Sequence, residues 1–148
     1  MSPEPKLLHF DVADNLYRLL AKAAGRKYRV GQRVNLQFAD VNSMPSPGVF
    51  VIALAEWKRA RLEDVYPDGS RVLLAVEVLS PGNRKPALQS KINIYTKHGI
   101  EAWLVDPKLQ EVKVYSGKKV RTASLNDGSV LQWNGKPVPL SAIFRLPG

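Results

Sequence analysis

The sequence predicts an α/β (α+β) fold, in which a mixed β-sheet is flanked by helices and extended by appended antiparallel strands. Three observations support this: a strand-helix-strand pattern over residues 72–107, a second almost wholly apolar stretch over 49–55, and short alternating segments after residue 107. The chain has 148 residues, 45% of them hydrophobic. That is enough to bury one core but hardly two, so we expect a single domain over residues 1–148.

The first third of the chain is expected to form a helix and then a hairpin. Asp11 is suited to cap a helix whose apolar side chains recur on one face, and Gly25 is suited to end it. Tyr28–Phe38 is typical of a β-hairpin that bends near Gly31.

Two further apolar segments are expected to be central strands. Val49–Ala55 follows a turn-forming stretch and has strand length, and the polar Glu56–Gly69 predicts a short helix or loop. In Val72–Leu79, seven apolar residues surround Glu77, so both faces of that strand must be covered. A lone carboxylate in such a strand is costly unless something nearby compensates it.

A helix that follows the Glu77 strand offers the compensating group. It can start near Arg84 and stop at Gly99, and its side chains at i, i+3, i+4 and i+7 share one face. These side chains are Leu88, Lys91, Ile92 and Tyr95. Because a strand-helix-strand crossover is right-handed, the helix would lie across Glu77, and Lys91 and Tyr95 would converge on the carboxylate.

The rest of the chain predicts strands and a closing turn. Ile100–Asp106 is expected to be the second strand of the central unit, with Trp103 in the core. Alternation over residues 111–115, around Val120 and over 129–133 predicts short antiparallel strands. The tail over residues 140–146 is expected to make one turn against the core.

The composition favours a polyanionic partner. Lysine and arginine number 22 against 13 acidic residues, a formal net charge of +9. Five basic residues and no acid lie between positions 22 and 33, and among them Arg26, Lys27 and Arg29 are candidate phosphate contacts. The alternatives are a soluble basic protein without such a partner and a solvated face of the helix and hairpin.

Cysteine and histidine usage limits the chemistry. The chain has no cysteine and two histidines, so a thiolate or histidine-rich metal site is excluded and any metal must be bound by oxygen. We expect His98 to be exposed near a helix end and His9 to pack locally or lie at the surface. No stretch is long and apolar enough to span a membrane, so a cytoplasmic protein without a membrane partner is expected.

Several short motifs resemble a known family. They are Val76-Glu77-Val78-Leu79-Ser80-Pro81, Asn83-Arg84, Lys91 followed by Tyr95, the run from Gly99 to Pro107, and Val112-Lys113-Val114-Tyr115. On these residues the chain is similar to the Uma-two family of restriction endonucleases, within the PD-(D/E)XK nuclease superfamily. The resemblance covers most of the chain and implies a restriction-endonuclease-like sheet.

The resemblance also implies a metal-dependent phosphodiesterase site. Glu77 would be the strand carboxylate that holds Mg²⁺ or Mn²⁺, and Lys91 the lysine that has moved onto the following helix. Tyr95, Arg84 and Lys85 would position substrate or the lysine. The expected partner is nucleic acid, with DNA as the expected substrate and a homodimer as the expected assembly.

One position departs from the family pattern. Its Pro-Asp-hydrophobic-x-Val motif aligns with Pro47-Gly48-Val49-Phe50-Val51, so Gly48 stands where the first metal-binding aspartate is expected. Loss of one charge at about 4 Å from a cation costs roughly 4 kcal/mol per cation charge at an effective dielectric of 20. Three other carboxylates are alternatives for the missing ligand: Asp40, Glu63 and Asp64.

Two functional hypotheses therefore stay open. The first is a metal-dependent endonuclease that is impaired at Gly48. The second is a catalytically inactive protein that keeps the nuclease fold and binds nucleic acid or a protein partner. In the second case Glu77 and Lys91 would be a buried ion pair that joins helix to sheet, with Tyr95 merely packing.

Overall fold

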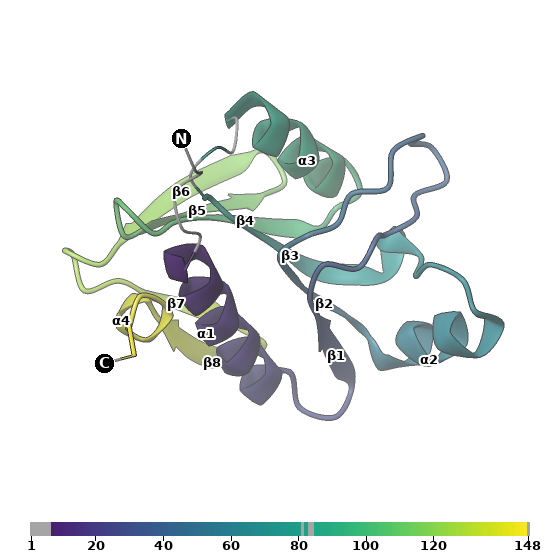
Figure 1. Ribbon diagram of the computed structural model, residues 1–148, viewed down its shortest axis with the longest axis horizontal. Coiled ribbons are helices and arrows are strands. Elements are labelled where there is room, and N and C mark those ends of the chain that lie inside the picture. Colours follow the sequence, from purple (N-terminus) through teal and green to yellow (C-terminus); the bar gives the residue numbers. More distant parts are fainter. Residues whose placement is uncertain (1–6, 81, 83–84, 148) are drawn as a thin grey trace.

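A six-stranded mixed sheet forms the centre of the computed structural model, which describes residues 7–80, 82 and 85–147. The strands lie in chain order across the sheet (Figure 1), and only the β3–β4 pair is parallel. They are β1 (Tyr28–Gly31), β2 (Val49–Ala53), β3 (Val72–Val78), β4 (Glu101–Asp106), β5 (Glu111–Ser116) and β6 (Lys119–Ser124). The predicted mixed α+β architecture is confirmed.

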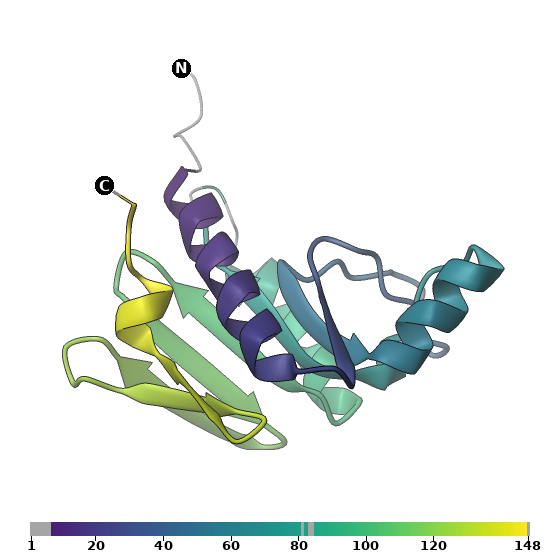
Figure 2. The same ribbon diagram turned by 90° about the horizontal axis from the view of Figure 1, so that it is seen from below.

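Helices cover both faces of this sheet. One core joins α1 (Leu7–Ala24) and α4 (Leu140–Ile143) to one face, and the other joins α3 (Lys85–Lys97) to the opposite face. Figure 2 shows α1 lying across its face, with α4 and the small β7–β8 sheet beside it. That small sheet pairs β7 (Val130–Trp133) with β8 (Lys136–Pro139). The remaining helices are α2 (Leu54–Glu63) and the short 3₁₀ turn η1 (Gly69–Arg71).

The strand-helix-strand unit forms as the sequence predicts. β3 is buried on both faces apart from Leu73, and α3 packs on it through Leu88, Ile92 and Tyr95. Gly99 has a φ of +75°, a left-handed conformation that ends the helix at low cost. β4 then returns parallel to β3, as a crossover of this kind requires.

The start of α1 was predicted wrongly. The helix begins at Leu7 rather than after Asp11, and Asp11 lies inside it as a half-buried residue. The segment that precedes Asp11 contains no glycine or proline after position 5, so nothing local stops the helix from extending toward the N-terminus.

The hairpin over residues 28–38 was also predicted wrongly. β1 pairs with β2, and the only strand-like contact in 34–38 is an isolated bridge from Gln37 to Asp68. The amides of Leu36 and Gln37 instead donate to the carbonyls of Pro45 and Pro67. Because proline has no N–H to donate in return, a reciprocal strand ladder cannot form there.

The C-terminal part follows the expectation with one addition. The predicted antiparallel strands appear as β5, β6 and β7, and the closing turn is α4, with Leu140 and Ile143 buried. β8 was not predicted, because Pro137 and Pro139 mask its strand character in the sequence. Among the helices of the described residues, none is long and apolar enough to cross a membrane.

Candidate functional site

Glu77 is the centre of the candidate site. It lies near the end of β3 on the face covered by α3, and the residue is 4% exposed. The Tyr95 hydroxyl donates to Glu77 Oε2 at 2.7 Å, and Lys91 Nζ lies 3.8 Å from Oε1. The structure therefore brings together the three side chains that the helix periodicity predicted would meet.

Burial dominates the electrostatics of this group. Desolvation raises the pKa of Glu77, while the Lys91 charge and the Tyr95 hydrogen bond act in the opposite direction. Burial and the adjacent Glu77 carboxylate also raise the pKa of Tyr95, so this hydroxyl stays protonated and acts as a donor. The surroundings of Glu77 therefore disfavour its ionised form.

Gly48 lies beside Glu77, where the family pattern expects an aspartate. Val49 pairs with Val76 in the antiparallel β2–β3 ladder. The next pair in this register is Gly48, which directly precedes β2, and Glu77. A Cβ at Gly48 would lie 3.4 Å from the Val76 carbonyl oxygen and 3.9 Å from the Val78 nitrogen, the peptide groups on either side of Glu77. The φ of Gly48 is not positive, so a side chain is compatible with its backbone.

The predicted substrate contacts are spread over the molecule. Lys85 is exposed and lines a pocket of about 140 Å³ together with Leu104, the register partner of Glu77. Arg84 lies outside the described residues. Lys85 is therefore the one member of this pair that the structure places near the β3–β4 surface.

The basic group of Arg26, Lys27 and Arg29 is exposed but does not adjoin Glu77. The Lys27 carbonyl accepts from the amide of Leu54, at the end of β2 far from Gly48. At about 3.3 Å per residue, the strand separates them by roughly 15 Å or more. Arg29 rests on the Trp57 ring, with its guanidinium carbon 4.8 Å from the ring centroid.

A second polar cluster was not predicted. His98 Nε2 lies 2.6 Å from Asp40 Oδ1, and Lys97 Nζ lies 3.1 Å from Asp40 Oδ2. Hydrogen bonds from His98 and Lys97 lower the pKa of Asp40 to about 2. His98 is therefore not an exposed residue as expected: its side chain is 16% exposed and packs against Phe38 with ring centroids 4.5 Å apart.

The alternative carboxylates for the missing metal ligand are engaged or distant. Asp40 is held by His98 and Lys97, and Glu63 pairs with Arg59 at 3.0 Å. Asp64 is an exposed residue at the end of α2 with a φ of +55°. None of the three has a contact with Glu77 in the described part of the chain.

The donor set tests whether a divalent cation suits this site. The carboxylate oxygens of Glu77 are hard ligands of the kind that Mg²⁺ and Mn²⁺ prefer. Within the described residues, however, no group of three or more acidic, histidine or cysteine side chains can hold a metal. The chemistry of Glu77 fits such a cation, but the described residues supply a single carboxylate there, so ligands from water or a substrate would have to complete the site.

The chain shares its fold with a solved structure that is described as a nuclease. It is similar to a solved structure described as "a putative nuclease belonging to DUF820" from Anabaena variabilis ATCC 29413, with a TM-score of 0.78 and 18% sequence identity over 97% of this chain and 84% of that chain. The chain belongs to the Uma2 family, whose sequence model, described as "Putative restriction endonuclease", matches residues 1–135. No curated protein matches the sequence. The resemblance read from the sequence is confirmed, and family and fold together indicate a nuclease.

Proposed function

We propose that the protein acts on the phosphodiester backbone of nucleic acid, DNA in the first instance, and that its hydrolytic activity depends on a weakly bound Mg²⁺ or Mn²⁺. The observation that supports this most directly is the convergence of Glu77, Tyr95 and Lys91 beside an open position at Gly48. When bound, the cation would polarise a phosphoryl oxygen and acidify a water molecule.

Each side chain has a distinct role in this proposal. Tyr95 is buried and donates to Glu77, so it fixes the orientation of the carboxylate. Lys91 is 38% exposed and is too far from Glu77 Oε1 for a hydrogen bond, so its ammonium group can turn toward a substrate phosphate. There it would stabilise the negative charge that develops during hydrolysis.

Gly48 is expected to weaken this activity. It supplies no ligand in the place of the family aspartate, and burial raises the pKa of the one remaining carboxylate, Glu77. These two observations favour a second candidate function, a protein that binds nucleic acid and does not cut it. Both functions share the binding step and differ in hydrolysis.

A Gly48→Asp variant separates the two candidates. Because the backbone at Gly48 accepts a side chain, the aspartate is expected to add a carboxylate beside Glu77 and to tighten Mg²⁺ or Mn²⁺ binding by about a thousandfold or more, from roughly 4 kcal/mol per cation charge at about 4 Å. Calorimetry measures the binding, and a plasmid-nicking assay measures cleavage. Gly48→Asn is the matched control, since it has nearly the same shape and no charge.

The outcomes discriminate clearly. Tighter metal binding and faster nicking in Gly48→Asp, abolished by Glu77→Gln in the same chain, support a nuclease that is impaired at position 48. A wild type that already nicks DNA and loses this with Glu77→Gln shows that one carboxylate suffices. If neither the wild type nor folded Gly48→Asp binds metal, the nuclease assignment of this site is wrong and Glu77 has a structural role.

A further inference from the structure

Arg33 is held next to Gly48 by its backbone. It follows β1 with a φ of +53°, a left-handed conformation that is uncommon for a residue with a side chain. Its amide donates to the Pro47 carbonyl at 3.0 Å, so the turn is pinned to the residue that precedes Gly48. Such a conformation persists only where surrounding contacts impose it, and it is frequent at ligand-binding positions.

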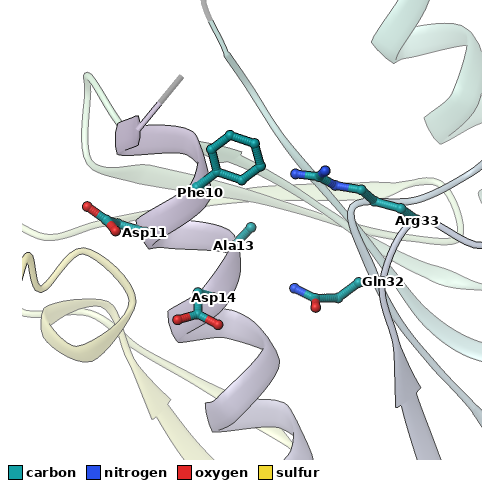
Figure 3. A pocket seen from close by; sticks show the side chains of 6 residues that line it. All are labelled: Phe10, Asp11, Ala13, Asp14, Gln32 and Arg33. Carbon is teal, nitrogen blue, oxygen red and sulfur yellow. The ribbon is translucent and has the colours of Figure 1, made fainter. Parts of the chain in front are cut away.

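The Arg33 side chain is exposed and held in place by an aromatic ring. Its guanidinium carbon lies 4.7 Å from the centroid of the Phe10 ring, and Figure 3 shows the two side chains pointing toward each other from α1 and from the segment after β1. Among the described residues, no carboxylate forms an ion pair with this guanidinium. The stacked cation therefore has its hydrogen-bond donors available for another ligand.

Two adjoining hollows share Phe10 and Arg33, and their chemistry differs. One, of about 480 Å³, also contains Asp11 and Asp14, whose charges oppose an anion (Figure 3). The other, of about 280 Å³, is also lined by His9, Ser46, Gly48, Val78 and Ser80. Its described lining contains hydroxyl groups, an imidazole and a guanidinium but no carboxylate, so no negative charge among these residues opposes an anionic oxygen there.

The second hollow lies at the end of β3 that carries the candidate catalytic site. Gly48 lies opposite Glu77 across the β2–β3 ladder, and Val78 is the next residue of β3. Because successive strand residues point to opposite faces, Val78 packs in the core under α1 whereas Glu77 faces α3. A phosphate bound in this hollow would therefore lie at the same end of β3 as Glu77, on the α1 face of the sheet. The geometry connects an arginine without an ion pair among the described residues, an anion-compatible lining and the end of the strand that carries the candidate catalytic carboxylate.

We propose that Arg33 binds a backbone phosphate of a nucleic-acid strand in the hollow beside Gly48 and so holds the strand at the end of β3 that carries Glu77. The proposal rests on the proposed function and names the residue that holds its substrate. A guanidinium can donate two parallel hydrogen bonds to one phosphate, which fixes its orientation as well as its distance. Arg33 is a binding residue here, and the bond-breaking step is left to the Glu77 site.

Arg33→Gln tests the proposal, with Arg121→Gln as its matched control. Both changes remove one exposed positive charge, but Arg121 lies in β6, at the opposite edge of the sheet from β1. Glutamine at position 33 keeps the same backbone demand as arginine, since both carry a Cβ. Circular dichroism and thermal unfolding establish that each variant is folded.

Binding is measured by fluorescence anisotropy with a labelled DNA duplex in the presence of EDTA. For Arg33→Gln we expect about a tenfold loss of affinity at 50 mM salt, as for removal of a charged hydrogen bond, and a slope of log Kobs against log salt that is smaller by about one. Arg121→Gln is expected to bind like the wild type, and Arg33→Lys to keep the slope while losing part of the affinity. If folded Arg33→Gln binds DNA with wild-type affinity and slope, the proposal is wrong.

Because EDTA removes divalent cations, the result does not depend on cleavage. Arg33-dependent binding by a protein that never cuts DNA would support the phosphate site and refute the nuclease activity. Cleavage of DNA by a protein whose DNA affinity is unchanged in Arg33→Gln would support the nuclease activity and refute the phosphate site. Inorganic phosphate serves as a competitor: displacement of the duplex only at millimolar concentrations supports a nucleic-acid strand as the ligand, whereas displacement at micromolar concentrations would assign the hollow to free phosphate.

Discussion

At the scale of single residues, the two partners of Glu77 have different tasks. Tyr95 is fully buried and lies at a short hydrogen-bond distance of 2.7 Å, so it fixes the carboxylate. Lys91 lies at 3.8 Å and is partly exposed, which is the geometry of a loose ion pair. Because Lys91 forms no hydrogen bond with Glu77, its ammonium group remains available to a substrate phosphate. The Tyr95 hydroxyl is already used in its hydrogen bond to Glu77.

Lys91→Met measures how much of the ion pair is structural. Because Lys91 is 38% exposed, solvent screens the pair, and we expect a loss of about 1 kcal/mol in the free energy of unfolding rather than the 3 to 5 kcal/mol of a dry pair. Chemical denaturation of Lys91→Met, Glu77→Gln and the double variant gives the coupling energy. A coupling of about 3 kcal/mol or more would mean that the pair is mainly structural, and strictly additive effects would mean that the two groups do not interact.

At the scale of elements, α3 and the residue that follows it connect two polar clusters. Lys91 and Tyr95 reach Glu77, while Lys97 and His98 at its C-terminal end bind Asp40 on the loop before β2. His98 Nδ1 also lies 2.7 Å from the Ile94 carbonyl oxygen, so the ring contacts both Asp40 and the helix backbone. The loop that leads toward Gly48 is thereby fastened to the helix that carries Lys91.

Asp40→Asn is expected to weaken the contacts between this loop and the C-terminal end of α3 in a pH-dependent way. The pKa of Asp40 falls from 3.8 to about 2 in the folded protein because His98 and Lys97 donate to it. A lowered carboxyl pKa adds stability above its ordinary value, and this stability is lost as the pH falls through 3.8 toward 2. Hydrogen exchange of the Val41 amide, which donates to Phe38, should therefore be several-fold faster in Asp40→Asn than in the wild type at pH 6.

The comparison at low pH provides the internal control for this prediction. Near pH 2, which is about the pKa of Asp40, a large share of this carboxyl group is protonated in the wild type, so the difference between it and the variant should shrink. Asp127→Asn, which changes an exposed aspartate in a turn far along the chain, should leave the hydrogen-exchange rate of the Val41 amide unchanged at both pH values. Equal exchange in the wild type and Asp40→Asn at pH 6 would show that the Asp40 contacts do not hold the loop.

The elements also show which features a sequence can predict. Glu77, Lys91 and Tyr95 were predicted to meet because helix periodicity and a right-handed crossover, both local rules, fix their relative positions. The positions and partners of Arg33 and Asp40 were not predicted, because each reaches its place through a loop whose path depends on distant proline carbonyls and on side chains elsewhere in the fold. The same non-local hydrogen bonds explain why the predicted 28–38 hairpin is absent.

At the scale of the whole molecule, the proposed phosphate contacts lie in two places. Arg33 lies beside Gly48, whereas Arg26, Lys27 and Arg29 lie at the far end of β1 and β2. A duplex that contacts both would run along the β1–β2 edge of the sheet. The net charge of +9 draws nucleic acid to the protein, but only local contacts decide where it binds.

The last prediction tests that placement by charge reversal. Wild-type protein should bind duplex DNA with an affinity that falls steeply as salt rises, and reversal of Arg26, Lys27 and Arg29 to glutamate should lower the slope of log Kobs against log salt by up to about three. Reversal of Lys118, Lys119 and Arg121, which lie at or beside β6, changes the net charge equally and is the matched control. Because both triple variants carry the same net charge, long-range attraction falls alike in both, and any difference in slope comes from direct phosphate contacts. An equal or larger change of slope in the control would indicate that the binding surface lies at the β6 edge. Undetectable binding of the wild type near 50 mM salt would exclude nucleic acid as the partner.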